Sequence, residues 1–191
     1  MEPKVRGAEN VMEQMDEERV GLTVIFTGDG KGKTSAALGV VARCVGHGGR
    51  CKMIQFIKGS LKSGEANLSK TLAPNLEIVQ VGRGFTWLAD VPREEHIKAA
   101  RDGMEMARAA LVSGEYDLVV LDEILYALKA GLVEVEQIEE LIAAKPARTH
   151  LILTGRGAPQ RLIDKADLVT SMTMVKHHSS ARIKAQKYMD F

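Results

Sequence analysis

The 191-residue sequence contains little cysteine, few aromatic residues, almost no net charge and no long apolar run. Its two cysteines, Cys44 and Cys51, are separated by six residues, a spacing that fits neither a CxxC redox pair nor a zinc site with four ligands. Two cysteines without a disulfide or metal pattern indicate a reducing compartment, so we expect a cytoplasmic protein.

Signals for membrane insertion or secretion are also missing. No apolar stretch approaches the ~18 residues of a membrane span, and the first 20 residues contain six acidic side chains, which argues against a signal peptide. Lysine and arginine number 26 against 25 aspartates and glutamates, a formal net charge of +1. Because no general positive field surrounds such a chain, we expect neither nucleic acid nor a membrane as a partner.

What remains is the ordinary composition of a globular domain, with 45% hydrophobic and 27% charged residues. The length suits one domain. Residues 1–20 form a polar arm, residues 21–175 the domain, and residues 176–191 a tail in which cations outnumber acids. We expect this basic tail to pack on or near the active site.

Short apolar segments alternate with helical patterns along the domain. We expect strands at 22–26, 51–57, 76–81, 116–121, 149–154 and 168–174. We expect helices at 35–45, 93–112 and 159–165, and two more within 124–144, parted at Gly131. Residues 58–74 are predicted to be a surface excursion and 82–92 a loop. Strands alternating with helices predict an α/β fold with a mostly parallel sheet and helices on both faces.

The most informative motif is the glycine-rich run from Gly28 to Thr34, between a predicted strand and a predicted helix. Backbone N–H groups of such a loop converge on one point, and the helix N-terminus adds partial positive charge, so the loop suits a polyphosphate. Lys33 can neutralise phosphate oxygens and the Thr34 hydroxyl can bind magnesium, while Lys31 adds a second cation.

The match to a strict Walker A motif is imperfect. That motif needs a glycine five positions before Gly32, where this chain has Thr27, and Gly28 comes one residue late. The loop is therefore expected to be tighter than usual. The competing interpretation is a glycine-rich turn without chemical meaning.

Asp122 and Glu123 follow an apolar run and should lie at the carboxyl end of a strand, where ligands of open α/β sheets gather. Two carboxylates there can hold a hydrated magnesium ion beside the phosphates. The alternatives are a solvated acidic turn that caps the next helix, or an acid that acts as a base on water in a nucleotide hydrolase.

Phe85 and Trp87 fall in a predicted loop of a chain with only 4% aromatic residues and one tryptophan. Taken alone, such aromatics more often fill a local hydrophobic gap than bind a ligand. Lys58 and Arg156 could meet phosphate or amide groups, but taken alone they fit solvated surface charges.

Several motifs together resemble the P-loop corrinoid adenosyltransferases. They are Thr27–Ala37, Arg43 with Val45–Gly48, Gln55–Gly59, Gly84–Trp87, Leu121–Ile124 and Leu153–Arg156. The resemblance covers about residues 21–187, and the combination is far more specific than the glycine loop alone. It implies a P-loop NTPase-like, Rossmann-like sheet and a homodimer. The terminal segment departs from the family, which usually has Lys-His-Pro and glycines where this chain reads Lys176 to Arg182.

The resemblance implies transfer of the 5′-deoxyadenosyl group of ATP to cob(I)alamin, with release of triphosphate. By position it assigns Gly28, Asp29, Gly30, Lys31, Gly32, Lys33, Thr34 and Ser35 to the nucleotide, with Asp29 next to a ribose hydroxyl. Thr34 and Glu123 would flank Mg²⁺ or Mn²⁺, with Asp122 nearby. Phe85 and Trp87 would line the corrin pocket and displace the lower axial ligand of cobalt, so that these two and Lys33 are the expected catalytic residues.

Because cobalt must be reduced to Co(I), the resemblance also implies a reductase partner. Two other functions stay open from the residues themselves. One is a P-loop ATPase that uses Asp122 and Glu123 for magnesium and water activation. The other is a nucleotide-sensing binding module without turnover.

Overall fold

The computed structural model describes residues 19–59, 64–86 and 91–190. The elements in chain order are β1 (Thr23–Thr27), α2 (Lys33–Gly46), β2 (Cys51–Gln55), α3 (Gly64–Thr71), β3 (Leu76–Gln80), α4 (Arg93–Val112), β4 (Leu118–Asp122), α5 (Ile124–Lys129), α6 (Val135–Ala144), β5 (His150–Thr154), α7 (Gln160–Ile163), β6 (Leu168–Ser171) and the short 3₁₀ helix η1 (His178–Ala181).

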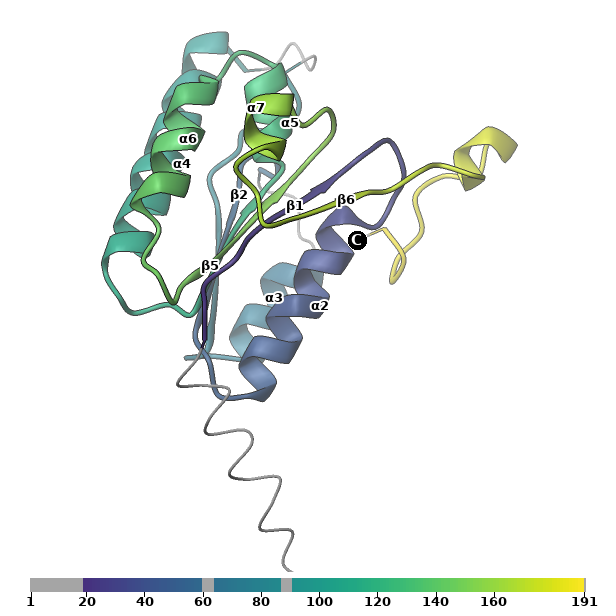
Figure 1. The fold of residues 1–191 in the computed structure, drawn as a ribbon. Helices are drawn as coiled ribbons and strands as arrows, with labels where there is room; N and C mark the ends of the chain where they lie inside the picture. The colour runs from purple at the N-terminus through teal and green to yellow at the C-terminus, as the bar shows by residue number, and fades with distance from the viewer. Residues whose placement is uncertain (1–18, 60–63, 87–90, 191) are drawn as a thin grey trace, which may run out of the picture.

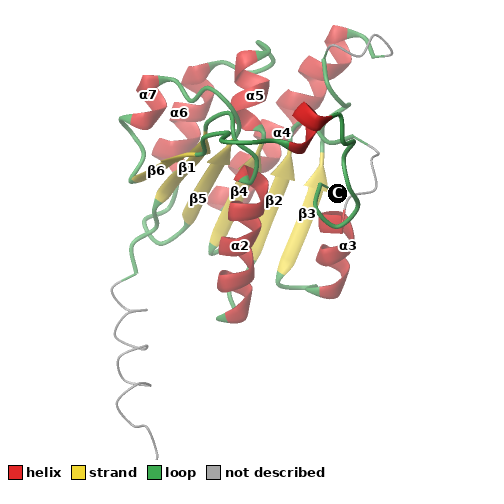
Figure 2. Cartoon of the chain, turned by 90° about the vertical axis from the view of Figure 1, so that its right-hand side faces the viewer, coloured by secondary structure: helices red, strands yellow, loops and turns green. Residues whose placement is uncertain are grey.

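The strands form one six-stranded sheet in the order β3-β2-β4-β5-β1-β6, and every pair is parallel. All carboxyl ends therefore lie at the same edge, as the arrowheads in Figure 2 show. The register places Gln55 at the end of β2 opposite Asp122 at the end of β4. This arrangement confirms the predicted parallel sheet and brings the polar strand ends together.

Helices cover both faces of the sheet, as predicted. Helices α2 and α3 lie on one side, and α4, α5, α6 and α7 lie on the other (Figure 1). Strand β4 shows why both faces need a cover, because Leu118 and Val120 pack toward α2 while Val119 and Leu121 pack toward α4. Each such aliphatic side chain contributes about 1.5–3 kcal/mol when it leaves water. The buried strands thus fix the positions of the loops at their ends.

The main departure from the predicted elements is helix α3. Residues 58–74 were expected to be a surface excursion, but Gly64–Thr71 are helical. None of the α3 residues is fully buried, so the segment has no strong apolar stripe from which a helix could be predicted. Smaller differences occur at strand ends: β4 begins at Leu118 and β6 ends at Ser171, whereas Tyr116 and Met174 were expected.

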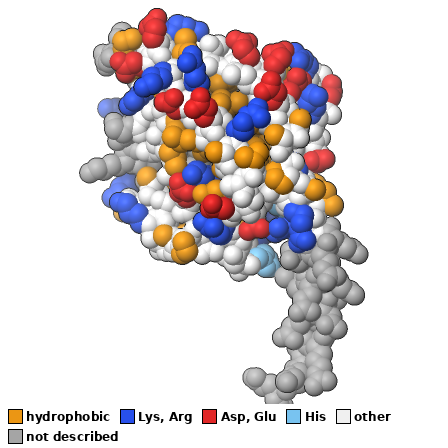
Figure 3. Space-filling model, turned by 90° about the vertical axis from the view of Figure 1, so that its left-hand side faces the viewer, with side chains coloured by type: hydrophobic (Ala, Val, Ile, Leu, Met, Phe, Trp, Pro, Cys, Tyr) orange, Lys and Arg blue, Asp and Glu red, His pale blue; other side chains and the backbone are white. Residues whose placement is uncertain are grey.

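The chain after β6 runs across the carboxyl ends of the strands and over the start of α2 (Figure 2). On the face covered by α4 and α6, acidic and basic side chains are interspersed and do not separate by sign (Figure 3). This face therefore offers no uniform field to a polyanion. Among the described residues, no helix is both long enough and apolar enough to cross a membrane.

Candidate active site

The glycine loop connects the end of β1 at Thr27 to the start of α2 at Lys33. Gly28 and Gly32 have positive φ angles of 90° and 112°, which L-residues with side chains rarely adopt. A Cβ on Gly28 would also lie 2.4 Å from the carbonyl oxygen of Met172. Glycine is required here both by backbone conformation and by the close approach of the chain after β6.

Lys33 is 6% exposed, and its ammonium group lies inside the loop. Its Nζ donates to the carbonyl oxygens of Gly28 and Gly30, at 2.9 and 2.7 Å. Burial lowers the pKa of Lys33, while the carboxylates of Glu123, Asp29 and Asp122 act in the opposite direction. The ammonium group is thus held by two neutral acceptors, with which an anionic oxygen would compete for its protons.

Not every amide of the loop is free for an anion. The Gly30 N–H donates to the Met172 carbonyl at 2.7 Å, so it faces the chain after β6. The predicted polyphosphate contact from Gly30 therefore cannot use this N–H while that bond is present.

Thr34, Asp122 and two further polar side chains form one hydrogen-bond network. The Thr34 hydroxyl donates to Asp122 Oδ1 at 2.8 Å, and the Thr154 hydroxyl donates to the same oxygen at 2.8 Å. Gln55 Nε2 donates to Asp122 Oδ2 at 3.0 Å. Asp122 is fully buried. Because Thr34 gives its proton to Asp122, the lone pairs of its oxygen remain available to a cation.

Glu123 adopts a left-handed backbone conformation with φ of 60°, and its N–H donates to the Thr154 hydroxyl at 2.9 Å. This turn directs Glu123 away from its neighbour Asp122 and into a cavity. Burial raises the pKa of Glu123, and the Asp122 carboxylate raises it further. A cation in the cavity would offset both effects and favour the ionised carboxylate.

The cavity has a volume of 630 Å³ and lies at the carboxyl edge of the sheet, between the glycine loop, Glu123 and the tail. Residues Gly30–Ser35 line it, but Gly28 and Asp29 do not. The structure thus brings together Lys31, Lys33, Thr34 and Glu123 as the site prediction requires. The assignment of each residue to nucleotide or metal stays a prediction.

The tail contributes one wall of this cavity through His177, Tyr188, Met189 and Asp190. Asp190 Oδ1 pairs with Lys31 Nζ at 2.9 Å, and the Gln186 N–H donates to Asp190 Oδ2 at 2.7 Å. These contacts lower the pKa of Asp190, the Gln186 hydrogen bond most. Although cations outnumber acids in the tail, the side chain that pairs with Lys31 of the loop is acidic.

Lys58 and Arg156 line the same cavity, although either taken alone fitted a solvated surface charge. Lys58 pairs with Glu65 of α3 at 2.6 Å. Arg156 lies close enough to influence the pKa values of both Lys33 and Glu123. Four cations thus face one cavity, together with Glu65, Glu123 and Asp190, and two of the cations are already paired with these acids.

Phe85 follows β3 at the same edge of the sheet, and 41% of its surface is exposed. Its ring packs edge-on against Tyr126 of α5, with 5.9 Å between the ring centroids and 78° between the planes. The Tyr126 and Thr86 hydroxyls are hydrogen-bonded at 2.8 Å. The sequence analysis did not identify Tyr126 as a candidate site residue. The signal that could have indicated it is its position three residues after Glu123. Trp87 lies outside the described residues.

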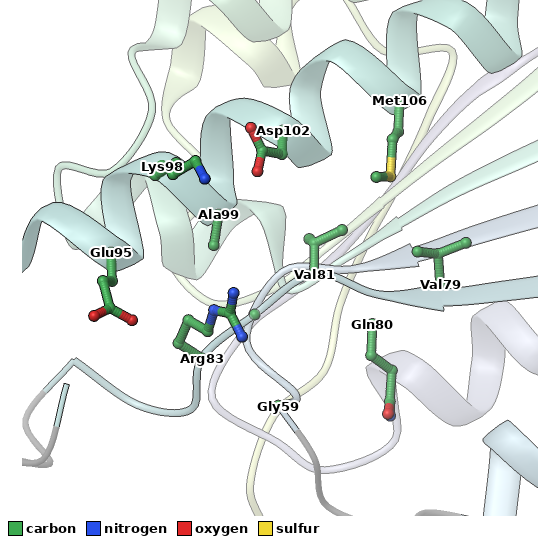
Figure 4. Close-up of a pocket in the computed structure, with 11 residues that line it drawn as sticks. Gly59, Val79, Gln80, Val81, Arg83, Glu95, Lys98, Ala99, Asp102 and Met106 are labelled. Atoms are coloured by element: carbon green, nitrogen blue, oxygen red, sulfur yellow. The ribbon is translucent and has the colours of Figure 1, made fainter.

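A second cavity of 540 Å³ lies between β3 and α4, on the face opposite α2. Figure 4 shows Lys98 and Asp102 on α4 and Arg83 reaching toward the helix from the loop after β3. With Glu95, this groove has two cations and two acids. No predicted nucleotide or metal residue lines it, so the first cavity is the better candidate for the active site.

A family model described as ATP:corrinoid adenosyltransferase BtuR/CobO/CobP matches residues 19–191. The match includes the glycine loop, the acidic pair and the tail. It therefore covers every part of the cavity described above.

Three curated relatives align with the chain over nearly their full lengths. The chain is 39% identical to a corrinoid adenosyltransferase of Pseudomonas aeruginosa, over all of this chain and 93% of that protein. It is 38% identical to corrinoid adenosyltransferase CobA of Salmonella typhimurium and 37% identical to a corrinoid adenosyltransferase of Escherichia coli K12. Both alignments cover 93% of this chain and 89% of the relative.

Proposed function

Because the chain belongs to the ATP:corrinoid adenosyltransferase family, we propose that it transfers the 5′-deoxyadenosyl group of ATP to a Co(I) corrinoid and releases triphosphate. The observation that carries the proposal is the single cavity in which Lys31, Lys33, Thr34 and Glu123 meet. These residues suit a polyphosphate that leaves as a unit.

The reaction needs positioning and charge neutralisation more than a base. The electron pair of Co(I) attacks C5′ of the ribose, a cobalt–carbon bond forms, and the C5′–O bond breaks. Triphosphate departs with the electron pair of that bond, and cobalt becomes formally Co(III). No proton moves in this step, so no general base is required of Asp122 or Glu123.

The departing triphosphate gains negative charge at the oxygen that leaves C5′, and the cations of the cavity stabilise it. Lys33 supplies a buried ammonium held by two carbonyl oxygens. Lys31, Lys58 and Arg156 add charge at the cavity wall. A preorganised contact such as that of the buried Lys33 is worth about 3–4 kcal/mol to a transition state.

We further propose that Thr34 and Glu123 hold Mg²⁺ or Mn²⁺ on the triphosphate. The donor set fits a hard cation, since Thr34 turns its proton to Asp122 and Glu123 presents a carboxylate to the same cavity. When bound, the ion neutralises phosphate charge. Asp122 would orient Thr34, and because Oδ1 accepts two hydrogen bonds and Oδ2 only one, its remaining Oδ2 lone pair is the one that could contact the ion.

The corrinoid would meet the exposed Phe85 at the carboxyl end of β3, and the resemblance to the family assigns Trp87 to the same pocket. Asp29 beside the ribose is part of the same proposal. The resemblance to the family supports a homodimer, and the need for Co(I) supports a reductase partner and a reducing, cytoplasmic setting for the free thiols Cys44 and Cys51.

One assay tests the proposal against its rivals. The protein is incubated with ATP, magnesium and chemically reduced corrinoid, the visible spectrum is followed, and the phosphate products are separated. Formation of an alkylcobalt spectrum with one inorganic triphosphate per cobalt is expected. ADP and phosphate would instead indicate an ATPase, and binding of ATP without either product would indicate a sensing module.

A further inference from the structure

Tyr126 connects helix α5 to the aromatic loop, which we define as Gly82–Thr86. Its hydroxyl is hydrogen-bonded to the Thr86 hydroxyl at 2.8 Å, and its ring meets the Phe85 ring at 78°. The two contacts act on neighbouring residues of the loop, one polar and one aromatic. Together they restrain the distance of the loop from α5 and the orientation of the Phe85 ring.

Helix α5 is a rigid base for these contacts. Its residues Ile124, Leu125 and Ala127 are completely buried. The helix also packs closely on Gly155, where a Cβ would lie 2.8 Å from Leu125 Cβ and 3.0 Å from the Tyr126 nitrogen. A side chain at Tyr126 therefore starts from a fixed backbone.

The same helix begins directly after the acidic pair. The Tyr126 N–H donates to the Glu123 carbonyl at 3.1 Å. Tyr126 thus belongs to the helix that starts directly after Glu123, and its side chain contacts the loop that carries Phe85. This position suits a group that keeps the two substrates in register.

The stem of the aromatic loop is fixed, but burial does not fix Phe85. The Gly82 N–H donates to the Gln55 carbonyl at 3.2 Å, and the Gly84 N–H donates to the Ile57 carbonyl at 2.9 Å. These bonds attach the stem to the end of β2. The Phe85 ring is 41% exposed, so burial in the core contributes less to its orientation than contacts at its sides, and Tyr126 provides one of these.

We infer that Tyr126 is a positioning residue for the corrinoid substrate. It acts by holding Phe85 and Thr86 in the position from which the Phe85 ring contacts the corrin. The inference rests on the proposed function. Tyr126 matters most when the ring must displace the lower axial ligand of a Co(II) corrinoid before reduction. It matters less once Co(I) is supplied, because Co(I) has already lost that ligand.

Three variants test the inference. Tyr126→Phe and Thr86→Val each remove the hydrogen bond between the two hydroxyls and nearly keep the shape of the side chain. The double variant removes the same single hydrogen bond. Tyr116→Phe is the matched control, because the Tyr116 hydroxyl also donates a 2.8 Å hydrogen bond, to Glu77, outside both cavities. Thermal unfolding verifies that each variant folds.

Two measurements are made on each variant. The first compares the transfer rate from a Co(II) corrinoid plus reductant with the rate from chemically prepared Co(I) corrinoid. The second is the electron paramagnetic resonance spectrum of bound Co(II) corrinoid with ATP, which gives the fraction of cobalt without a lower axial ligand. The spectrum reports positioning without turnover.

We expect Tyr126→Phe to lower the Co(II) rate and the ligand-free fraction about three- to tenfold, the usual equilibrium effect of one hydrogen bond. The Co(I) rate should change less than about twofold. Thr86→Val should act alike, and the double variant should add little to either. The Tyr116→Phe control should match the wild type.

An unchanged spectrum and rate ratio in Tyr126→Phe would overturn the inference, and equal losses from Co(II) and Co(I) would reduce Tyr126 to a packing residue. Failure of the proposed function has a different signature, in which the wild-type protein forms no cobalt–carbon bond from Co(I) corrinoid and ATP.

Discussion

Asp122 and Glu123 are adjacent in the sequence but have different surroundings and different chemistry. Asp122 is enclosed by Thr34, Thr154 and Gln55, and its two oxygens accept three hydrogen bonds. Glu123 lines the cavity, and burial raises its pKa. The first carboxylate therefore positions a hydroxyl, while the second remains available to a cation.

Lys33→Ala tests the main leaving-group contact. The variant loses an ammonium held inside the loop by Gly28 and Gly30, so the rate of transfer should fall about 100- to 1,000-fold. Steady-state assays with Co(I) corrinoid measure the effect. Lys129→Ala, which removes an exposed lysine of α5, is the control and should keep the wild-type rate. Comparable rates in both variants would contradict the assignment.

His150 predicts a pH dependence of stability. Its Nδ1 accepts a hydrogen bond from the Leu22 N–H at 3.0 Å. Burial lowers the pKa of His150, as do Arg19 and Lys145, while Asp117 raises it. The unfolded chain therefore takes up a proton before the folded one, and stability falls as the pH drops below the unfolded value of about 6.5.

The test is His150→Asn, which keeps an acceptor for Leu22 without titrating near neutrality. Between pH 7.5 and 5.5 the wild-type Tm should fall further than that of the variant, by the order of 1–2 °C. His47→Asn changes an exposed histidine and should follow the wild type. Parallel curves for His150→Asn and the wild type would refute the prediction.

At the scale of elements, Gly103 determines how closely α4 approaches the sheet. A Cβ at Gly103 would lie 2.9 Å from Phe56 Cε1 and 2.9 Å from Val81 Cγ2. Phe56 is buried, with 3% of its surface exposed, so its ring cannot easily move aside. The helix uses a poor helix former here because any side chain would press on the core.

Gly103→Ala should therefore destabilise the fold by about 1–3 kcal/mol. The matched control is Gly39→Ala in α2, where no atom lies within 4 Å of the added Cβ. That change should stabilise by about 0.5–1 kcal/mol through helix propensity. Urea unfolding of both variants measures the difference. Equal stabilisation by the two alanines would contradict the prediction and show that α4 can move away from the sheet.

The tail reaches the glycine loop through Asp190, which pairs with Lys31 and would compete with an anion for it. Asp190→Asn should tighten the binding of inorganic triphosphate about two- to fivefold at low ionic strength, the usual range for an exposed ion pair, and the gain should shrink with salt. Titration calorimetry measures both. Asp102→Asn, in the groove of α4 on the other face of the sheet from α2, should leave the affinity unchanged. Weaker binding in Asp190→Asn would mean that Asp190 assists the nucleotide.

At the scale of the whole molecule, the cavity joins residues from the ends of β1 and β4 and from the tail. A bound nucleotide therefore stabilises the complete fold. With MgATP at 100 times its dissociation constant, Tm should rise by about 5–10 °C. Chelation by EDTA should remove most of the rise, and Lys33→Ala should show little of it. An equal rise with and without the chelator would exclude a metal bridge.

Much of the sheet and of the glycine loop could be predicted, because local patterns determine them. The run Gly28–Thr34 and the pair Asp122–Glu123 each follow an apolar strand, and that position alone indicates their common edge. The expected strands agree with β1 through β6 except at their ends.

The rest depends on contacts between segments far apart in the chain. Helix α3 has no buried residue to give it a clear stripe. Tyr126 meets the aromatic loop across 40 residues of sequence, and no spacing rule predicts such a pair. The cations drew attention to the tail, yet its contact to Lys31 is made by Asp190, because electrostatic partners depend on tertiary geometry.

The contact between the glycine loop and the chain after β6 affects the order in which the protein can mature on the ribosome. Gly30 donates to the Met172 carbonyl, and the Met172 N–H donates to the Thr27 carbonyl. A nascent chain that ends before Met172 therefore has the whole motif but lacks the residue after β6 that contacts it. Nucleotide capture should therefore begin only after Met172 has been synthesised and has left the ribosome, so translation products that stop before it would not sequester ATP.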